Sequence, residues 1–67
     1  MKLENAIKKV EKAGFTVYEN NGFYTCKKEG HADVKFMSNS DGTKAQCFNT
    51  GETFVKNITA AITISKK

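Results

Sequence analysis

The first part of the chain alternates apolar and charged residues with the period of an α-helix. Its apolar positions are Leu3, Ala6, Ile7, Val10 and Ala13, and charged side chains, most of them lysines, fill many of the positions between them. Because residues three and four apart share one side of a helix, this spacing predicts an amphipathic helix over residues 3–13. Gly14 is the expected end of the helix, since glycine adopts a positive φ without steric cost.

From residue 15 to residue 49 the period changes to two, which is typical of strands with one buried face. Three turn signals divide this stretch, namely Asn21-Gly22, Lys28-Glu29-Gly30 and Asp41-Gly42. Asn-Gly favours a two-residue type I′ turn, and a loop of three residues accepts glycine in the left-handed conformation. The pattern therefore predicts four antiparallel strands joined in chain order by hairpins.

The turn lengths also predict which residues lie opposite each other. The expected pairs are Val17 with Cys26, Tyr24 with Val34, Cys26 with Ala32, Phe36 with Cys47 and Ser38 with Ala45. These pairs give one apolar face, which carries Phe15, Val17, Tyr24, Cys26, Ala32, Val34, Phe36, Ala45 and Cys47. A slip of one residue at any turn would scatter that set over both faces. Cys26 and Cys47 fall on non-adjacent strands, about 9–10 Å apart, so both are expected to be free thiols.

The segment 52–65 fits two kinds of structure. A helical stripe is formed by Phe54, Ile58, Ala61 and Ile62. Asn49 and Glu52 resemble a capping box before it, yet the β-branched residues of the segment also alternate as in a strand. About 13 residues is long for a strand, so length favours a helix. The predicted fold is a two-layer α+β domain with an N-terminal helix, a four-stranded antiparallel meander and a C-terminal helix (αββββα).

The size and composition of the chain narrow its possible roles. A single small domain over residues 1–67 is expected, with 11 lysines, no arginine and a net charge of +4. No apolar run approaches the roughly 20 residues that a membrane span needs, and the first residues do not resemble a signal peptide. Two cysteines and one histidine complete neither a zinc site nor a disulfide framework, so we expect no metal and no cofactor. Free thiols indicate a reducing compartment, and the expected location is the cytoplasm.

The face opposite the apolar one supplies the candidate binding residues. They are Tyr18, Phe23, Lys27, Lys35, Met37, Lys44 and Phe48. Lysines among aromatic rings on a sheet suit single-stranded nucleic acid, most simply RNA, because lysines neutralise phosphates and rings stack on bases. Without arginine such binding would be salt-sensitive and poorly selective for sequence. Two alternatives remain open: the surface binds a protein partner or a second copy, or its rings form cross-strand pairs that stabilise the sheet.

Catalytic signals are sparse. His31 lies beside a predicted turn with Asp33 two positions later, and a histidine near a carboxylate can act as a general base. The cysteines are predicted to face the core, where a thiol is inert. We therefore expect a non-catalytic binding protein, with an atypical ribonuclease centred on His31 as a third hypothesis.

One family resemblance bears on the fold and on that third hypothesis. The run from Ile7 to Phe15, a helix ending in a Gly-aromatic pair before a strand, resembles the start of HicA-type messenger-RNA-cleaving toxins. Their fold resembles the double-stranded-RNA-binding domain, so the resemblance implies a helix, a sheet and a helix. The histidine that those toxins carry after a glycine is replaced by Phe23, and the paired lysines of the RNA-binding domain by Phe54 and Val55. Small basic chains of this kind are also typical of accessory proteins of mobile elements.

Overall fold

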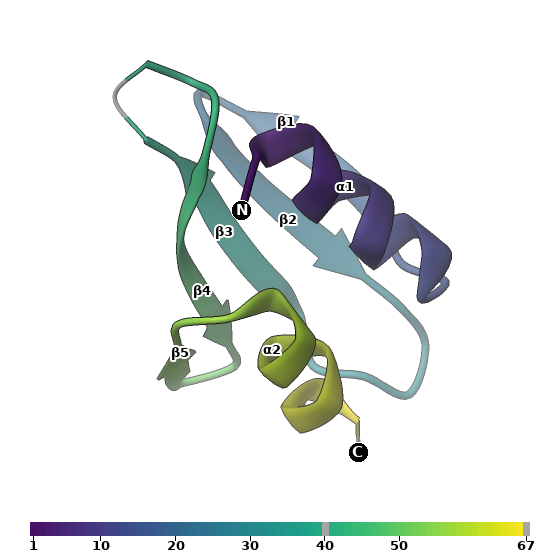
Figure 1. Ribbon diagram of the computed structural model, residues 1–67. Helices are drawn as coiled ribbons and strands as arrows, with labels where there is room; N and C mark the ends of the chain where they lie inside the picture. Colours follow the sequence, from purple (N-terminus) through teal and green to yellow (C-terminus); the bar gives the residue numbers. More distant parts are fainter. Residues whose placement is uncertain (40, 67) are drawn as a thin grey trace.

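A computed structural model describes residues 1–39 and 41–66 of the protein. Its elements are α1 (Leu3–Lys12), β1 (Thr16–Asn20), β2 (Phe23–Lys27), β3 (Val34–Ser38), β4 (Ala45–Thr50), β5 (Thr53–Val55) and α2 (Ile58–Ser65). The strands form one antiparallel sheet in the order β1-β2-β3-β4-β5, and both helices lie on the same side of it (Figure 1). The predicted α+β architecture is confirmed, although the sheet has five strands where four were expected.

Helix α1 forms where the apolar spacing predicted it. Ala6 and Val10, one turn apart, are fully buried against the sheet. The helix ends at a glycine in the left-handed conformation, since Gly14 has φ 97°. The Gly14 amide donates to the Glu11 carbonyl and the Phe15 amide to the Val10 carbonyl, which is the Schellman arrangement. This turn directs the chain into β1.

The first two hairpins keep the predicted apolar residues on the helix side of the sheet. Val17 lies opposite Cys26, as expected for the Asn21-Gly22 turn, in which both residues have positive φ. In the second hairpin, however, Cys26 faces Val34 and not Ala32, so the predicted register is wrong by two residues. The connection between β2 and β3 is longer than the three-residue loop expected. A shift of two residues preserves the faces, because side chains alternate with a period of two.

In the third hairpin, two residues lie on the opposite faces of the sheet from those predicted. Ser38 pairs with Ala45 as expected, but the register shifts between Met37 and Ser38, and Met37 then pairs with Cys47. Gln46 is the extra residue of a β-bulge, because it lies between the two paired positions of β4. The bulge reverses the faces beyond it. The predicted places of Cys47 in the core and Phe48 on the opposite face are therefore wrong: Phe48 is buried and Cys47 is exposed.

The C-terminal segment divides into a strand and a helix. Thr53–Val55 forms β5, which pairs with β4 through a tight turn in which Gly51 has φ 63°. Helix α2 begins six residues later than predicted, at Ile58. Asn57 is its N-cap, and the Asn57 side-chain oxygen accepts a hydrogen bond from the Ala60 amide at 2.9 Å. The expected cap, Asn49, instead lies in β4.

The core lies between the sheet and the two helices. Rings from three neighbouring strands fill its centre: Tyr24 stacks on Phe36 at 5.1 Å between centroids, and Phe36 contacts Phe48 at 5.9 Å. Helix α1 packs on β1 and α2 packs mainly on β4. Thr50 is buried beneath α2 and donates its hydroxyl to the Ala61 carbonyl. Within the described residues, no helix has both the length and the apolar character needed to cross a bilayer.

Candidate binding face of the sheet

The sheet side that faces away from both helices is the candidate site, and we call it the outer face. The strand register assigns to it Thr16, Tyr18, Asn20, Phe23, Thr25, Lys27, Lys35, Met37, Cys47, Asn49 and Phe54. Two rows of neighbours cross the strands. One runs Tyr18, Thr25, Lys35, Asn49, Phe54, and the other runs Asn20, Phe23, Met37, Cys47.

Three aromatic rings of this face are open to solvent. The exposed fraction is 54% for Tyr18, 54% for Phe23 and 76% for Phe54. Tyr18 and Phe23 lie on the adjacent strands β1 and β2, and Phe54 lies on β5 at the opposite edge of the sheet, with Met37 and Cys47 between the two ends. Exposed apolar surface that extends over several strands marks a contact site more often than isolated exposed residues do. The outer face is therefore the surface on which the protein has most to gain from a partner.

A hollow of about 270 Å³ lies on the outer face, and its lining is mostly apolar. Side chains from four strands line it: Phe23, Lys35, Met37, Cys47, Asn49 and Phe54. Phe23 on β2 and Phe54 on β5 are three strand positions apart, about 14 Å at the usual strand spacing. The hollow is thus a shallow depression with a ring at each end and the smaller side chains of β3 and β4 between them.

The positive charge on this face is modest. Lys27 and Lys35 are its two lysines, and the Lys27 ammonium lies 3.8 Å from the Asp33 carboxylate, with both side chains exposed. An exposed pair of this kind contributes little to stability, but it offsets part of the local charge. Lys35 is the charged residue that lines the hollow.

The structure brings together five of the seven predicted binding residues. Tyr18, Phe23, Lys27, Lys35 and Met37 share the outer face. Phe48 lies in the core, on the other side of the sheet. Lys44 lies outside the strands, beside the start of α1, where its backbone forms an isolated antiparallel β-bridge with the backbone of Lys2.

Three residues of the outer face that line the hollow were not among the predicted binding residues: Cys47, Asn49 and Phe54. The β-bulge placed Cys47 there, and nothing in the composition of β4 marks that bulge. Phe54 was assigned to a helical stripe, although Gly51-Glu52 before Thr53-Phe54-Val55 places glycine first in a two-residue turn, which is a signal for a type II′ hairpin. That turn was the signal that would have found Phe54.

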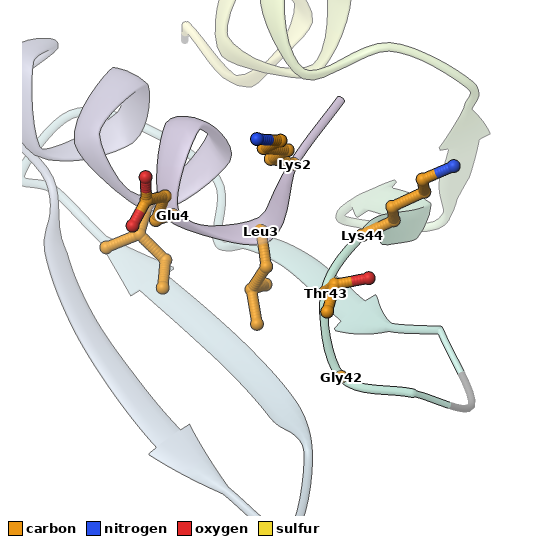
Figure 2. Close-up of a pocket in the computed structure, with 7 residues that line it drawn as sticks. Lys2, Leu3, Glu4, Gly42, Thr43 and Lys44 are labelled. Carbon is orange, nitrogen blue, oxygen red and sulfur yellow. The ribbon is translucent and has the colours of Figure 1, made fainter.

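Lys44 lines a separate groove of about 470 Å³ between the start of α1 and the loop that follows β3. The Leu3 amide donates to the Thr43 carbonyl at 2.6 Å, so the first turn of the helix is tied to this loop. Figure 2 shows the side chains of Lys2 and Lys44 pointing away from each other, while the Leu3 side chain extends in a third direction. The groove therefore does not gather its two lysines around one point.

His31 and Asp33 have different partners. The His31 Nδ1 atom lies 3.1 Å from the Ser65 hydroxyl, which itself donates to the Ile62 carbonyl at 2.7 Å. The hydroxyl thus accepts from Nδ1, and the imidazole also meets the Phe15 ring edge-on. Asp33 lies beside Lys27. These contacts join the β2–β3 connection to the end of α2, and within the described residues no cluster of acidic, histidine and cysteine side chains is placed to hold a metal ion.

The two thiols differ in environment, and both are free as predicted. Burial, and to a lesser extent the Glu11 carboxylate, raises the pKa of the Cys26 thiol to about 12. Cys47 is exposed at the hollow. Only Cys47 therefore offers a thiol at the candidate site.

No protein-family model matches this chain, and neither curated proteins nor solved structures include a significant match. The resemblance to HicA-type toxins stays a prediction from the sequence.

Proposed function

We propose that this protein is a non-catalytic protein-interaction module that binds a short segment of a partner protein on its outer face. The observation that carries the proposal is the hollow between Phe23 and Phe54, whose lining is nearly all apolar. Aromatic residues around an apolar depression are typical anchors of protein interfaces, where a few such side chains supply most of the binding energy.

The charge around the hollow indicates what the segment carries. Lys35 lines the hollow, and none of its described lining residues is acidic. A ligand with an apolar side chain between the rings and an aspartate or glutamate next to it would use both features. The net charge of +4 also favours approach of an acidic partner.

Single-stranded nucleic acid is the second candidate, and one row of the outer face favours it. Tyr18 and Phe54 stand at the two ends of the row in which Lys35 is central, so rings and a cation alternate across the strands. With two lysines on the face, the logarithm of the affinity would fall against the logarithm of salt with a slope of about −1.4. The absence of Phe48 and Lys44 from the face makes this surface smaller than the sequence predicted.

Selection of peptides from a random library displayed on phage tests the first proposal without a known partner. We expect enrichment of sequences in which an aromatic or aliphatic residue is next to an acidic one. Phe54→Ala should weaken the selected peptides about tenfold or more, because it removes one wall of the hollow. Lys35→Glu should reverse the charge preference of the selected peptides, whereas Lys9→Glu, the same change on the exposed side of α1, should not.

The same variants distinguish the two candidates. Titration of a fluorescent single-stranded RNA at about 50 mM and about 200 mM salt measures the nucleic-acid affinity and its salt slope. Tighter binding to RNA than to any selected peptide, lost in Phe54→Ala, would replace the first proposal with the second. If no peptide is enriched above an unrelated control protein, the peptide-binding proposal is wrong.

A further inference from the structure

The free edge of β1 is a second surface, separate from the hollow. Within the described residues β1 pairs with β2 alone, and four of its five residues are exposed. The opposite edge of the sheet ends in β5, which has three residues. A longer edge strand presents more unpaired amides and carbonyls, and these groups accept another strand.

The turn between β1 and β2 determines which backbone amides and carbonyls of β1 point away from β2. A two-residue turn closes on a hydrogen-bonded pair, which here is Asn20 with Phe23. Hydrogen-bonded pairs then alternate along the ladder, so Tyr18 and Thr16 also bond to β2. The amides and carbonyls of Val17 and Glu19 consequently face away from the sheet.

Of the usual protections of an edge strand, β1 has one, a charged residue that points to the helix side of the sheet. It contains no proline and no lysine, and its register with β2 is regular over all five residues. Its one charged residue is Glu19, whose carboxylate accepts a hydrogen bond from the Tyr24 hydroxyl at 3.3 Å. The edge is thus chemically suited to an extended chain.

We infer that the occupant of this edge is β1 of a second copy of the protein, paired antiparallel about a two-fold axis at Tyr18. Val17 of each copy would lie opposite Glu19 of the other, and the outward groups of both copies would bond at once. All five residues overlap in this register, because Val17 and Glu19 are symmetric about Tyr18. Closed two-fold pairing of this kind is the commonest symmetry of protein dimers.

The side chains agree with this register. The two copies of Tyr18 would face each other in a non-hydrogen-bonded pair on the outer face, where aromatic pairs stabilise a sheet. Each Glu19 would oppose a valine, with the other Glu19 diagonal to it. The paired sheets would join the two outer faces into one surface, while the hollow of each copy would stay open.

Amide exchange tests the inference residue by residue. As the concentration is raised toward about 1 mM, the Val17 and Glu19 amides should become protected while the molecular mass measured by light scattering rises toward that of a dimer. A pairing of one short strand is small, so we expect weak association typical of transient interfaces. A monomer at that concentration with unchanged exchange at both amides would overturn the inference.

Substitution of Glu19 by proline tests the dimer directly, because it removes one amide donor that faces away from β2 and breaks no hydrogen bond to β2. Glu19→Pro should weaken the dimer about tenfold or more and leave the circular dichroism spectrum unchanged. Glu19→Gln keeps the amide donor and removes the repulsion between the two diagonal Glu19 carboxylates, so it should strengthen the dimer. If Glu19→Pro unfolds the chain, a disulfide test replaces it. Tyr18→Cys in a Cys47→Ser background should oxidise to a covalent dimer, and failure to do so at about 1 mM would contradict the register.

The dimer and the peptide site are independent. Phe54→Ala should weaken peptide binding and leave the dimer intact, whereas Glu19→Pro should weaken the dimer and leave peptide binding intact. Loss of the dimer in Phe54→Ala would show that the copies associate through the outer face and not through the β1 edge.

Discussion

Among single residues, the two cysteines show most directly how position determines chemistry. Cys26 is fully buried and its pKa is raised, while Cys47 is exposed beside the hollow. A thiolate is the reactive form of cysteine, so iodoacetamide at neutral pH should modify Cys47 in the folded protein and leave Cys26 intact. Mass spectrometry of a peptide digest would locate the modification. Alkylation of Cys26 at the same rate as Cys47 without denaturant would contradict the assigned register of β4.

The Cys26 thiol also gives stability a pH dependence. Its ordinary value is 9.0, and burial followed by the Glu11 carboxylate raises the pKa to about 12. Above pH 9 the unfolded chain loses this proton before the folded one does, so the free energy of unfolding should fall as the pH rises from 9 toward 12. Burial and Glu19 also raise the pKa of Tyr24, which acts in the same direction at higher pH. The full contribution of Cys26 is present below pH 9.

Urea unfolding at neutral pH and near pH 10 measures this dependence. The control is Cys26→Ala, which loses packing at every pH but should show a smaller fall between the two conditions. Equal falls in the variant and the wild type would show that Cys26 does not cause the dependence.

Phe48 and Phe54 test the two faces of the sheet with the same substitution. Phe48 is buried against Phe36, whereas Phe54 is exposed on the outer face. Phe48→Ala should lower the free energy of unfolding by about 3–5 kcal/mol, because it leaves a cavity in the core. Phe54→Ala should change it by less than about 1 kcal/mol. Chemical denaturation of both variants measures the difference, and similar losses would contradict the assigned faces.

At the scale of elements, the start of α2 depends on one side chain. The Asn57 oxygen accepts from the Ala60 amide, so Asn57→Ala should destabilise the protein by about 1 kcal/mol. Asn49→Ala is the matched control, because Asn49 resembles a cap in the sequence but lies in β4. Thermal unfolding of both variants would show the larger loss for Asn57→Ala. A larger loss for Asn49→Ala would place the helix start upstream.

The sequence predicted these elements where local chemistry alone determines the outcome. Helix α1 follows from its spacing and from Gly14, and the first hairpin follows from Asn21-Gly22. The second hairpin was assigned the wrong register without consequence, since a shift of two residues keeps Tyr24 and Val34 in the core. The prediction of a helix over 52–65 was wrong at its beginning, because Thr53–Val55 pairs with β4 and forms a strand of the sheet.

The candidate site was predicted only in part, for a reason that lies outside local pattern. One unpaired residue in β4, Gln46, exchanges the faces of Cys47 and Phe48. A bulge depends on how two strands fit together, so no spacing in β4 alone reveals it. The part of the face on β1, β2 and β3 was found, because those strands alternate without interruption.

At the scale of the molecule, both helices cover one side of the sheet, and no other part of residues 1–39 and 41–66 forms a second layer on the opposite side (Figure 1). The core draws on residues from both helices and from β2, β3 and β4. The rings of Tyr18, Phe23 and Phe54 belong to the other side, so the packed layers do not require them. Their remaining structural role would be cross-strand pairing, and Phe23 does lie opposite Met37.

Replacing all three rings decides between binding and pairing as the reason for their presence. Threonine suits a strand, so the triple variant Tyr18→Thr, Phe23→Thr, Phe54→Thr should keep the far-ultraviolet circular dichroism spectrum of the wild type. Cross-strand pairs contribute roughly 0.2–1 kcal/mol each, and we therefore expect a total loss below about 2 kcal/mol together with higher solubility. Chemical denaturation measures that loss. A loss of several kcal/mol would assign the rings to the stability of the sheet, and the outer face would then need no partner to explain it.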